Sequence, residues 1–339
     1  MNRKVLFLLA SCGIAAIVAY RISQGDFDWA LFFSSLSNLK SRWLVASIIF
    51  SLGTYFIRAL RWRELLAPMK RVPLTQLFWA TIVGFSAIYL LGRAAELARP
   101  LWITRREHIP PSASIATVIV ERFLDSLMLI AVFAWALIGV EVPQGSVTVL
   151  SSLKTAGWFI GSTAVVAILV LFVFRRHVDV IAQLVRRLRF PRMAQLLENF
   201  AHGLNALTTA RSLTVVMLHS AALWAAMTLQ SWFLFFGMDF DFSYSAATLV
   251  MVALAIGSIA QIPGIGGGFQ VAWIFCLTTL FRIPVEQATA TALIAFVLSY
   301  APTIALAALY MLIQGISIRD FKTTIQTPSP KSLKQADAR

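Results

Sequence analysis

The sequence predicts an all-α integral membrane protein with six full transmembrane helices, two re-entrant helical hairpins in an inverted repeat, and both termini in the cytoplasm. Of its 339 residues, 59% are hydrophobic and 13% are charged, and the mean hydropathy is +0.78. Soluble domains are about 45–50% apolar and about 25% charged. Several apolar runs are long enough to cross a hydrocarbon core of about 30 Å as helix. A soluble enzyme and a disordered chain are therefore both excluded.

The positive charge is distributed as it is in a membrane protein. The net charge is +14, and 23 of the 29 lysines and arginines fall in five segments. These segments are Arg3 with Lys4, Arg58–Arg71, Arg93–Arg106, Arg175–Arg211 and Arg319–Arg339. Basic segments between membrane spans face the cytoplasm, so the charge indicates topology and does not indicate a nucleic-acid surface.

Two apolar runs are expected to turn back inside the bilayer. Leu74–Leu91 has a basic segment at each end, so a hairpin from Leu74 to Pro100 that enters from the cytoplasm keeps both segments there. Ala246–Phe281 has flanks that look external, and it contains IPGIGGGF at Ile262–Phe269. Proline removes a backbone donor and each glycine costs about 1 kcal/mol in a helix, so this run is interrupted. It predicts a second hairpin, entering from outside.

Span, hairpin, span then occurs twice in opposite directions. The two halves of this repeat cover residues 43–139 and 213–313, and residues 155–212 join them. We expect a single membrane domain of residues 1–322. A disordered basic tail, 323–339, follows it. Broken segments at matching places in inverted halves indicate a transport site near the midplane. Non-helical backbone at that depth must be buried or line a cavity. The remaining spans are Val5–Tyr20 and Thr155–Phe174, and Arg175–Arg211 predicts an amphipathic helix on the inner leaflet.

The run Ser112–Gly139 contains the motif ERFLD, whose acidic and basic side chains lie at a depth in the bilayer where burying a charge costs free energy. Glu121 lies about 13 Å along the helix, close to the middle of the core. Arg122 can pair with Asp125 at i, i+3, which leaves Glu121 without a cation. Ionisable groups at such positions are candidates for function by default.

The first hairpin is the natural source of that cation. GRAAELARP places Arg93, Glu96 and Arg99 at three-residue intervals, so Glu96 can satisfy one arginine and leave the other available. One interpretation is a structural salt-bridge cluster that holds the hairpin against the helix. The other is a charge-lined cavity for an anionic head group, because arginine binds phosphate oxygens in a bidentate manner.

Two further motifs have open alternatives. RALRWRELL places Arg58, Arg61 and Arg63 at a cytoplasmic helix end, where anchoring to inner-leaflet phosphates accounts for most of the charge and Arg61 is also a candidate for the head-group path. In IPGIGGGFQ, the amides of Gly264–Gly268 are candidates for anion binding at the start of a helix. Close helix packing by glycine is the alternative.

Enzyme chemistry finds little support in the sequence. No catalytic residue, cofactor or metal is expected, because Cys12 and Cys276 lie in apolar runs and the four histidines are scattered. No ATP-binding P-loop is present. DFD occurs at Asp26–Asp28 and Asp239–Asp241, and acidic residues in a first outer loop are also seen in glycosyltransferases that use lipid-linked sugars. That activity stays an alternative, for which the outer loops are short.

Four motifs in order resemble one family. RALRWRELL, GRAAELARP, VIVERFLD and IPGIGGGFQ, spread along nearly the full chain, resemble the flippase-like membrane domain of lysylphosphatidylglycerol synthase/flippases, including stand-alone membrane proteins of the UPF0104 type. The resemblance implies re-entrant helices and a role in moving a phospholipid or polyprenyl-linked lipid between leaflets. By matching position it indicates a substrate site at Arg61, Arg93, Glu96, Arg99, Glu121, Arg122 and the loop of Pro263, Gly264, Gly266, Gly267 and Gly268. Asp125 and Gln270 complete the predicted site.

The chain departs from that family in two ways. Gln270 stands where relatives commonly carry glutamate, which argues against cation coupling there and against a preference for a cationic aminoacyl head group. The soluble aminoacyl-transferase domain is absent, so synthesis of lysylphosphatidylglycerol is not expected. We expect a bacterial inner-membrane lipid translocator or lipid-binding protein. An accessory membrane protein for envelope glycolipid synthesis is the alternative. The expected partner is a membrane lipid, and a homo-oligomer or an envelope-biosynthesis partner stays open.

Overall fold

The computed structural model describes residues 27–143, 148–155, 209–262 and 266–315, together with positions 146, 157–158, 162, 183 and 186–187. The predicted span Val5–Tyr20, most of the run Thr155–Phe174, nearly all of the amphipathic segment Arg175–Arg211 and the tail 323–339 lie outside these residues.

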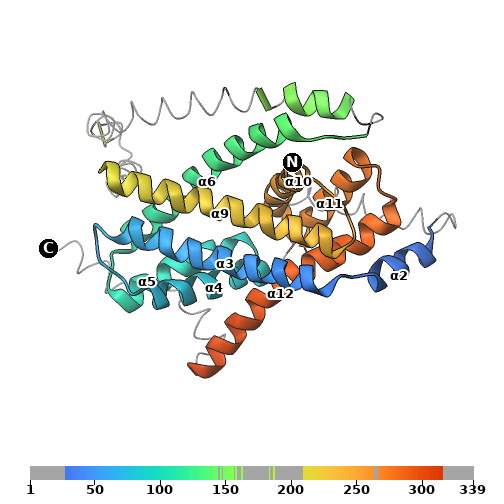
Figure 1. The fold of residues 1–339 in the computed structure, drawn as a ribbon. Coiled ribbons are helices and arrows are strands. Elements are labelled where there is room, and N and C mark those ends of the chain that lie inside the picture. Colours follow the sequence, from blue (N-terminus) through green and yellow to red (C-terminus); the bar gives the residue numbers. More distant parts are fainter. Residues whose placement is uncertain are drawn as a thin grey trace.

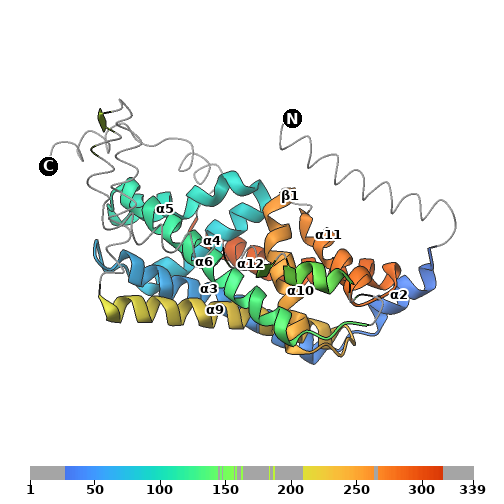
Figure 2. The same cartoon turned by 90° about the horizontal axis from the view of Figure 1, so that it is seen from above.

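Long apolar helices form the frame of the molecule. Among the described residues, four helices are long and apolar enough to cross a membrane: α3 (Ser41–Leu66), α4 (Leu74–Leu91), α9 (Ala210–Gly237) and α12 (Val285–Ile313). Helix α6 (Pro111–Gly139) is equally long but carries the ERFLD charges. Asp28 caps the N-terminus of the short helix α2 (Trp29–Ser37). The chain is thus a helical multi-pass membrane protein, in which α3 and α9 lie side by side (Figures 1 and 2).

The first predicted hairpin is a helix that folds back at a glycine. Helix α4 ends at Gly92, whose φ of 83° suits glycine, and the chain continues through a 3₁₀ turn, η1 (Arg93–Leu97), into α5 (Ala98–Glu107). A Cβ atom on Gly84 would lie 2.8 Å from Cβ of Arg99, so α4 and α5 are in close contact. Lys70 Nζ lies 2.9 Å from Glu107 Oε2, which brings the start and the end of the hairpin together.

The second hairpin is broken where the sequence predicted an interruption. Helix α10 (Tyr244–Gly257) passes through η4 (Ser258–Ala260) into β1 (Gln261–Ile262), which pairs antiparallel with β2 (Gly266–Gly267). The chain returns through α11 (Gly268–Phe275) and a π-helical turn, η5 (Cys276–Leu280). The rings of Phe242 and Phe281 are 4.5 Å apart, so the two ends of this hairpin also meet.

The two hairpins begin at opposite ends of α3. Lys70, at the base of the first hairpin, follows the C-terminus of α3, whereas the backbone N–H of Lys40, before its N-terminus, donates to Gly237 O at the end of α9, just before the second hairpin. Both tips reach the middle of α12, because Tyr89 and Phe269 pack against Tyr300 at ring distances of 4.2 and 5.4 Å. The hairpins therefore approach each other from the two ends and meet halfway.

Apolar side chains of the described residues pack in several buried clusters. One joins α3, α4, α5 and α6 around Trp62 and Leu77 and includes Val216 of α9, and the largest joins the end of α6 with α9–α12 around Phe235 and Trp273. Another joins α3, α4 and α5 to Ala307 and Tyr310 of α12. Between lipid-exposed helices such packing depends on close van der Waals contact. Buried charged and hydroxyl side chains gather beside these clusters on α3, α6 and α9, among them Arg61, Glu121 and Ser220.

Candidate functional site

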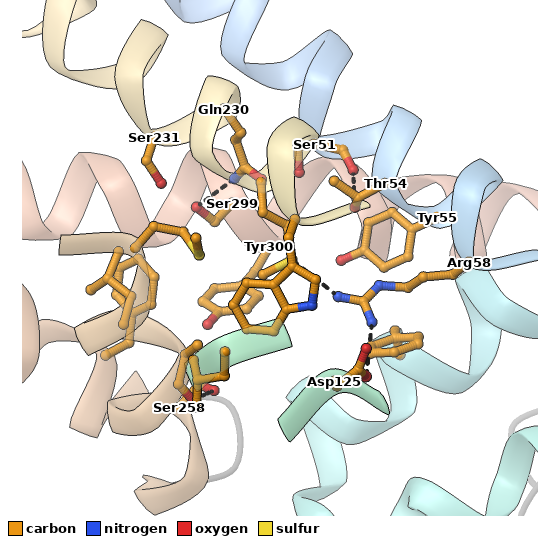
Figure 3. Close-up of a pocket in the computed structure, with 18 of the residues that line it drawn as sticks. Ser51, Thr54, Tyr55, Arg58, Asp125, Gln230, Ser231, Ser258, Ser299 and Tyr300 are labelled. Carbon is orange, nitrogen blue, oxygen red and sulfur yellow. Dashed lines mark hydrogen bonds and ion pairs between the residues drawn. The ribbon is translucent and has the colours of Figure 1, made fainter. Parts of the chain in front are cut away.

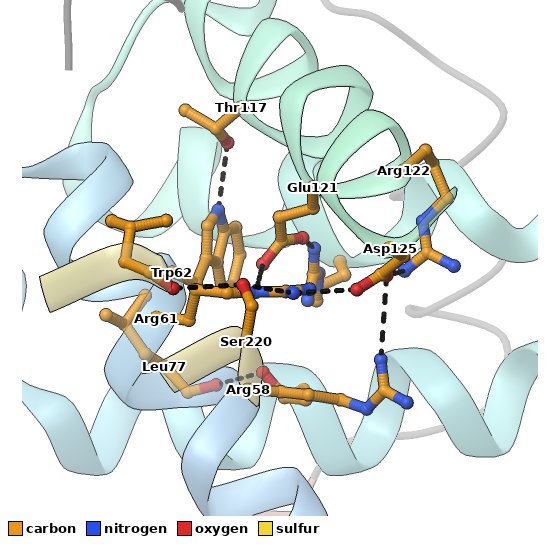
Figure 4. Close-up of polar contacts among 12 residues, drawn as sticks. Arg58, Arg61, Trp62, Leu77, Thr117, Glu121, Arg122, Asp125 and Ser220 are labelled. Atoms are coloured by element: carbon orange, nitrogen blue, oxygen red, sulfur yellow. Dashed lines mark hydrogen bonds and ion pairs between the residues drawn. The ribbon is translucent and has the colours of Figure 1, made fainter. Parts of the chain in front are cut away.

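Arg61 is the centre of a buried ionic cluster between α3, α6 and α9 (Figure 4). Its Nη1 donates to Asp125 Oδ1 at 2.7 Å and to Ser220 Oγ at 3.2 Å. Its Nε lies 3.9 Å from Glu121 Oε1. A buried guanidinium is tolerated only when it is paired in this way. Arg61 therefore connects three helices and does not line the cavity described below.

Glu121 receives its second cation from the first hairpin. Arg99 Nη2 donates to Glu121 Oε2, which is the pairing that the sequence predicted between this hairpin and the helix. The guanidinium of Arg99 also lies over the Trp62 ring, 4.2 Å from its centroid, and the Trp62 indole N–H donates to Thr117 Oγ1 at 2.9 Å. The ion pair and the stacked ring fix α5 against α3 and α6.

Arg122 faces the other side of α6. Its Nη2 lies 3.4 Å from Asp125 Oδ2, the predicted i, i+3 pair, and its Nε lies 3.3 Å from Glu96 Oε1. The described partner of Glu96 is thus an arginine of α6. The sequence pattern predicted instead that Glu96 would pair with an arginine of its own hairpin. Arg93 lies in η1, but its side chain is outside the described part of the structure.

A cavity of about 330 Å³ lies beside this cluster, where the hairpin tips meet (Figure 3). Its charged lining residues, among those described, are Arg58, Arg122 and Asp125. Its neutral polar lining includes residues of α3, α6, α9, η4 and α12: Ser51, Thr54, Ser126, Gln230, Ser231, Ser258 and Ser299. Both halves of the molecule therefore contribute to one cavity, of a size at the lower end of the range for ligand sites.

Arg58 is the residue that the sequence interpretation missed. Its sequence context favours an anchor to the inner leaflet, but its side chain is largely buried and lines the cavity. Its Nη1 lies 4.0 Å from Asp125 Oδ2, its Nη2 donates to Met227 Sδ at 3.5 Å, and its Nε has no hydrogen-bond partner among the described residues. Arg58 and Arg61 stand at i, i+3 and so share a helix face, which is the signal that could have found it.

The glycine loop serves packing in its described part. The N–H of Gly267 donates to Gln270 Oε1 at 2.7 Å, so the Gln270 side chain caps α11. A Cβ on Gly268 would lie 2.1 Å from Gly257 O, so these glycines let α10 and α11 touch. Neither Gly266 nor these residues line the cavity, whereas Phe269 does. Pro263 and Gly264 lie outside the described residues.

The two DFD motifs have structural partners. Asp28 Oδ1 accepts from the N–H of Leu31 at 3.0 Å and caps α2. Asp239 forms an ion pair with Lys40. Neither carboxylate lines the cavity, and Asp26 lies outside the described residues.

Comparison with known proteins agrees with the membrane architecture. A search of curated proteins gave no match. The family model described as "Lysylphosphatidylglycerol synthase TM region" matches residues 8–307, which include both hairpins, the ionic cluster and the cavity. The chain therefore belongs to the lysylphosphatidylglycerol synthase TM region family.

Proposed function

We propose that this protein binds a lipid with an anionic head group and moves it between the leaflets of the bacterial inner membrane. The observation that carries the proposal is the incompletely paired guanidinium of Arg58 in the cavity. Membership of a membrane family linked to lipid handling supports the same direction.

The ionic cluster has one positive charge in excess. Among the described side chains, its arginines are Arg58, Arg61, Arg99 and Arg122, and its carboxylates are Glu96, Glu121 and Asp125. Arg58 has the longest ion-pair distance to Asp125, 4.0 Å, and it faces the cavity. A phosphate oxygen at this position would complete its pairing with charge-assisted hydrogen bonds.

The cavity suits a head group without its acyl chains. Its volume of about 330 Å³ is small for a ligand site, and it reaches the surface where exposed Ser126 and Ile259 line it. A lipid would place its head group inside while its tails stay among the apolar side chains outside. The charge would then avoid bare hydrocarbon, where an ionic group costs several kcal/mol.

The proposal includes an orientation of the two hairpins in the membrane. With the Lys70–Glu107 end of the molecule in the cytoplasm, both hairpins are re-entrant and meet near the midplane at Tyr300. The halves then form an inverted repeat in which α3, α6, α9 and α12 are the full spans, as in other transporters with broken helices. The protein would act as a carrier and would catalyse no covalent reaction.

The test is transbilayer movement in vesicles. Purified protein is reconstituted into phosphatidylcholine vesicles with acyl-labelled phosphatidic acid, and a membrane-impermeant reductant reports the lipid in the outer leaflet. Wild type should move the lipid faster than empty vesicles do, and Arg58→Gln should lower the protein-dependent rate about tenfold or more, because a hydrogen bond to a charged group is lost.

Arg63→Gln is the matched control. It removes the same charge from the same helix, but Arg63 is partly exposed, pairs with Glu64 and does not line the cavity. It should keep the wild-type rate. Wild type equal to empty vesicles, or Arg58→Gln equal to Arg63→Gln, would count against translocation through this cavity and leave the accessory role.

A further inference from the structure

The charged end of the cavity presents two hydrogen-bond donors that have no partner among the described residues. Besides Arg58 Nε, the indole Nε1 of buried Trp224 lines the cavity and has no hydrogen-bond partner among the described residues. Trp224 lies one turn before Met227, whose Sδ accepts from Arg58, so both donors belong to the same end. Arginine and tryptophan side chains only donate, so a ligand group here must be an acceptor.

The acceptor of this end is already engaged. Asp125 is the carboxylate among the described lining residues, and it lies within 4.0 Å of Arg58, Arg61 and Arg122. A head group with an ammonium ion would bring a further cation beside three guanidinium groups without a carboxylate to pair with it. Burying an unpaired cation next to like charge is costly.

The opposite part of the cavity, among the described residues, carries no charge and presents polar side chains between apolar ones. Figure 3 shows Gln230, Ser231 and Ser258 on the side away from Arg58 and Asp125. Gln230 Nε2 donates to Ser299 Oγ at 3.2 Å, which joins α9 to α12 across this surface. Hydroxyl and amide groups can each donate and accept, so they match the hydroxyl groups of a polyol or a sugar.

We propose that the preferred lipid of this cavity is a phosphodiester with a neutral, hydroxyl-rich head group, and that lipids with an ammonium group are disfavoured. The phosphate lies against Arg58 and Trp224, and the hydroxyl groups lie against Gln230, Ser231 and Ser299. This inference rests on the proposed function and specifies its substrate class.

The experiment compares acyl-labelled lipids with identical chains in the same vesicles. Phosphatidylinositol carries the hydroxyl-rich head group, phosphatidic acid carries phosphate alone, and phosphatidylethanolamine carries an ammonium ion. Wild type should move phosphatidylinositol about fivefold faster than phosphatidic acid, because neutral hydrogen bonds are added, and phosphatidylethanolamine should be the slowest.

Variants locate the preference. Gln230→Leu should lower the ratio of the phosphatidylinositol rate to the phosphatidic acid rate to about one, and Ser231→Ala, a milder change, should lower it in the same direction. Gln314→Leu, at the exposed end of α12, should keep the wild-type ratio.

The outcomes separate the two claims. If phosphatidic acid moves but phosphatidylethanolamine moves as fast as phosphatidylinositol, or if the cavity variants keep the wild-type ratio, the head-group assignment is wrong while translocation stands. If no lipid moves faster than in empty vesicles, the proposed function fails and this inference fails with it.

Discussion

Arg58 and Arg61 are three residues apart on the same helix, yet their surroundings differ. Arg61 is fully buried among Glu121, Asp125 and Ser220, so its donors hold helices together. Both arginines keep donors without a hydrogen-bond partner among the described residues, Nε in Arg58 and Nε and Nη2 in Arg61, but of the two only Arg58 lines the cavity. Position along α3 therefore decides which of the two arginines a ligand in the cavity could reach.

Replacing Arg61 should damage the fold itself. Arg61→Leu leaves Glu121 and Asp125 buried with fewer cations, and breaking a buried ion pair costs about 3–5 kcal/mol. We expect a large fall in the unfolding temperature of the detergent-solubilised protein, measured by intrinsic tryptophan fluorescence. Arg63→Gln on the same helix is the control. Equal unfolding temperatures for the two variants would show that the cluster contributes nothing to stability.

The hairpins are the elements that distinguish this fold from a simple helical bundle. In the second one, Gly257 and Gly268 bring the backbones of α10 and α11 into contact, and the N–H of Gly267 is taken by Gln270. The described glycines thus fit the packing interpretation of the loop. Sequence alone left this open, because glycines for backbone contact and glycines for anion binding have the same pattern.

Gly268→Ala tests that packing. Its Cβ would lie 2.1 Å from the carbonyl oxygen of Gly257, so the backbone must shift, and overpacking of this kind costs about 1–3 kcal/mol. The unfolding temperature should fall. Gly53→Ala is the control, since its Cβ meets nothing within 4 Å and alanine favours helix. A Gly268→Ala protein as stable as the Gly53→Ala protein would contradict the close approach.

For the molecule as a whole, the sequence predicted the positions of helices and of their interruptions better than it predicted the cavity. The run Leu74–Leu91 coincides with α4, and the interruption at Ile262–Phe269 separates α10 from α11, because proline, glycine and hydropathy act locally. The cavity lining was not predictable in this way. Gln230 and Ser299 are ordinary polar residues of apolar helices, and only the fold brings them within hydrogen-bond distance.

The topology can be tested by cysteine accessibility. In a background without Cys12 and Cys276, single cysteines replace four exposed residues: Arg71, Arg105, Glu141 and Asp241. A membrane-impermeant maleimide should label the first two from the cytoplasmic side and the last two from outside, because basic ends face the cytoplasm. Arg71 labelled from the same side as Asp241 would rule out the proposed orientation of the hairpins.

Tyr300 has a consequence for motion. Its ring touches Tyr89 at one tip and Phe269 at the other, and Pro302, two residues on, interrupts the regular backbone hydrogen bonding of α12. A movement of either hairpin tip therefore changes the surroundings of Tyr300, which the other tip also contacts. If the protein moves lipid as proposed, opening toward one leaflet would be coupled to closure toward the other, with the helix around Pro302 as the expected hinge.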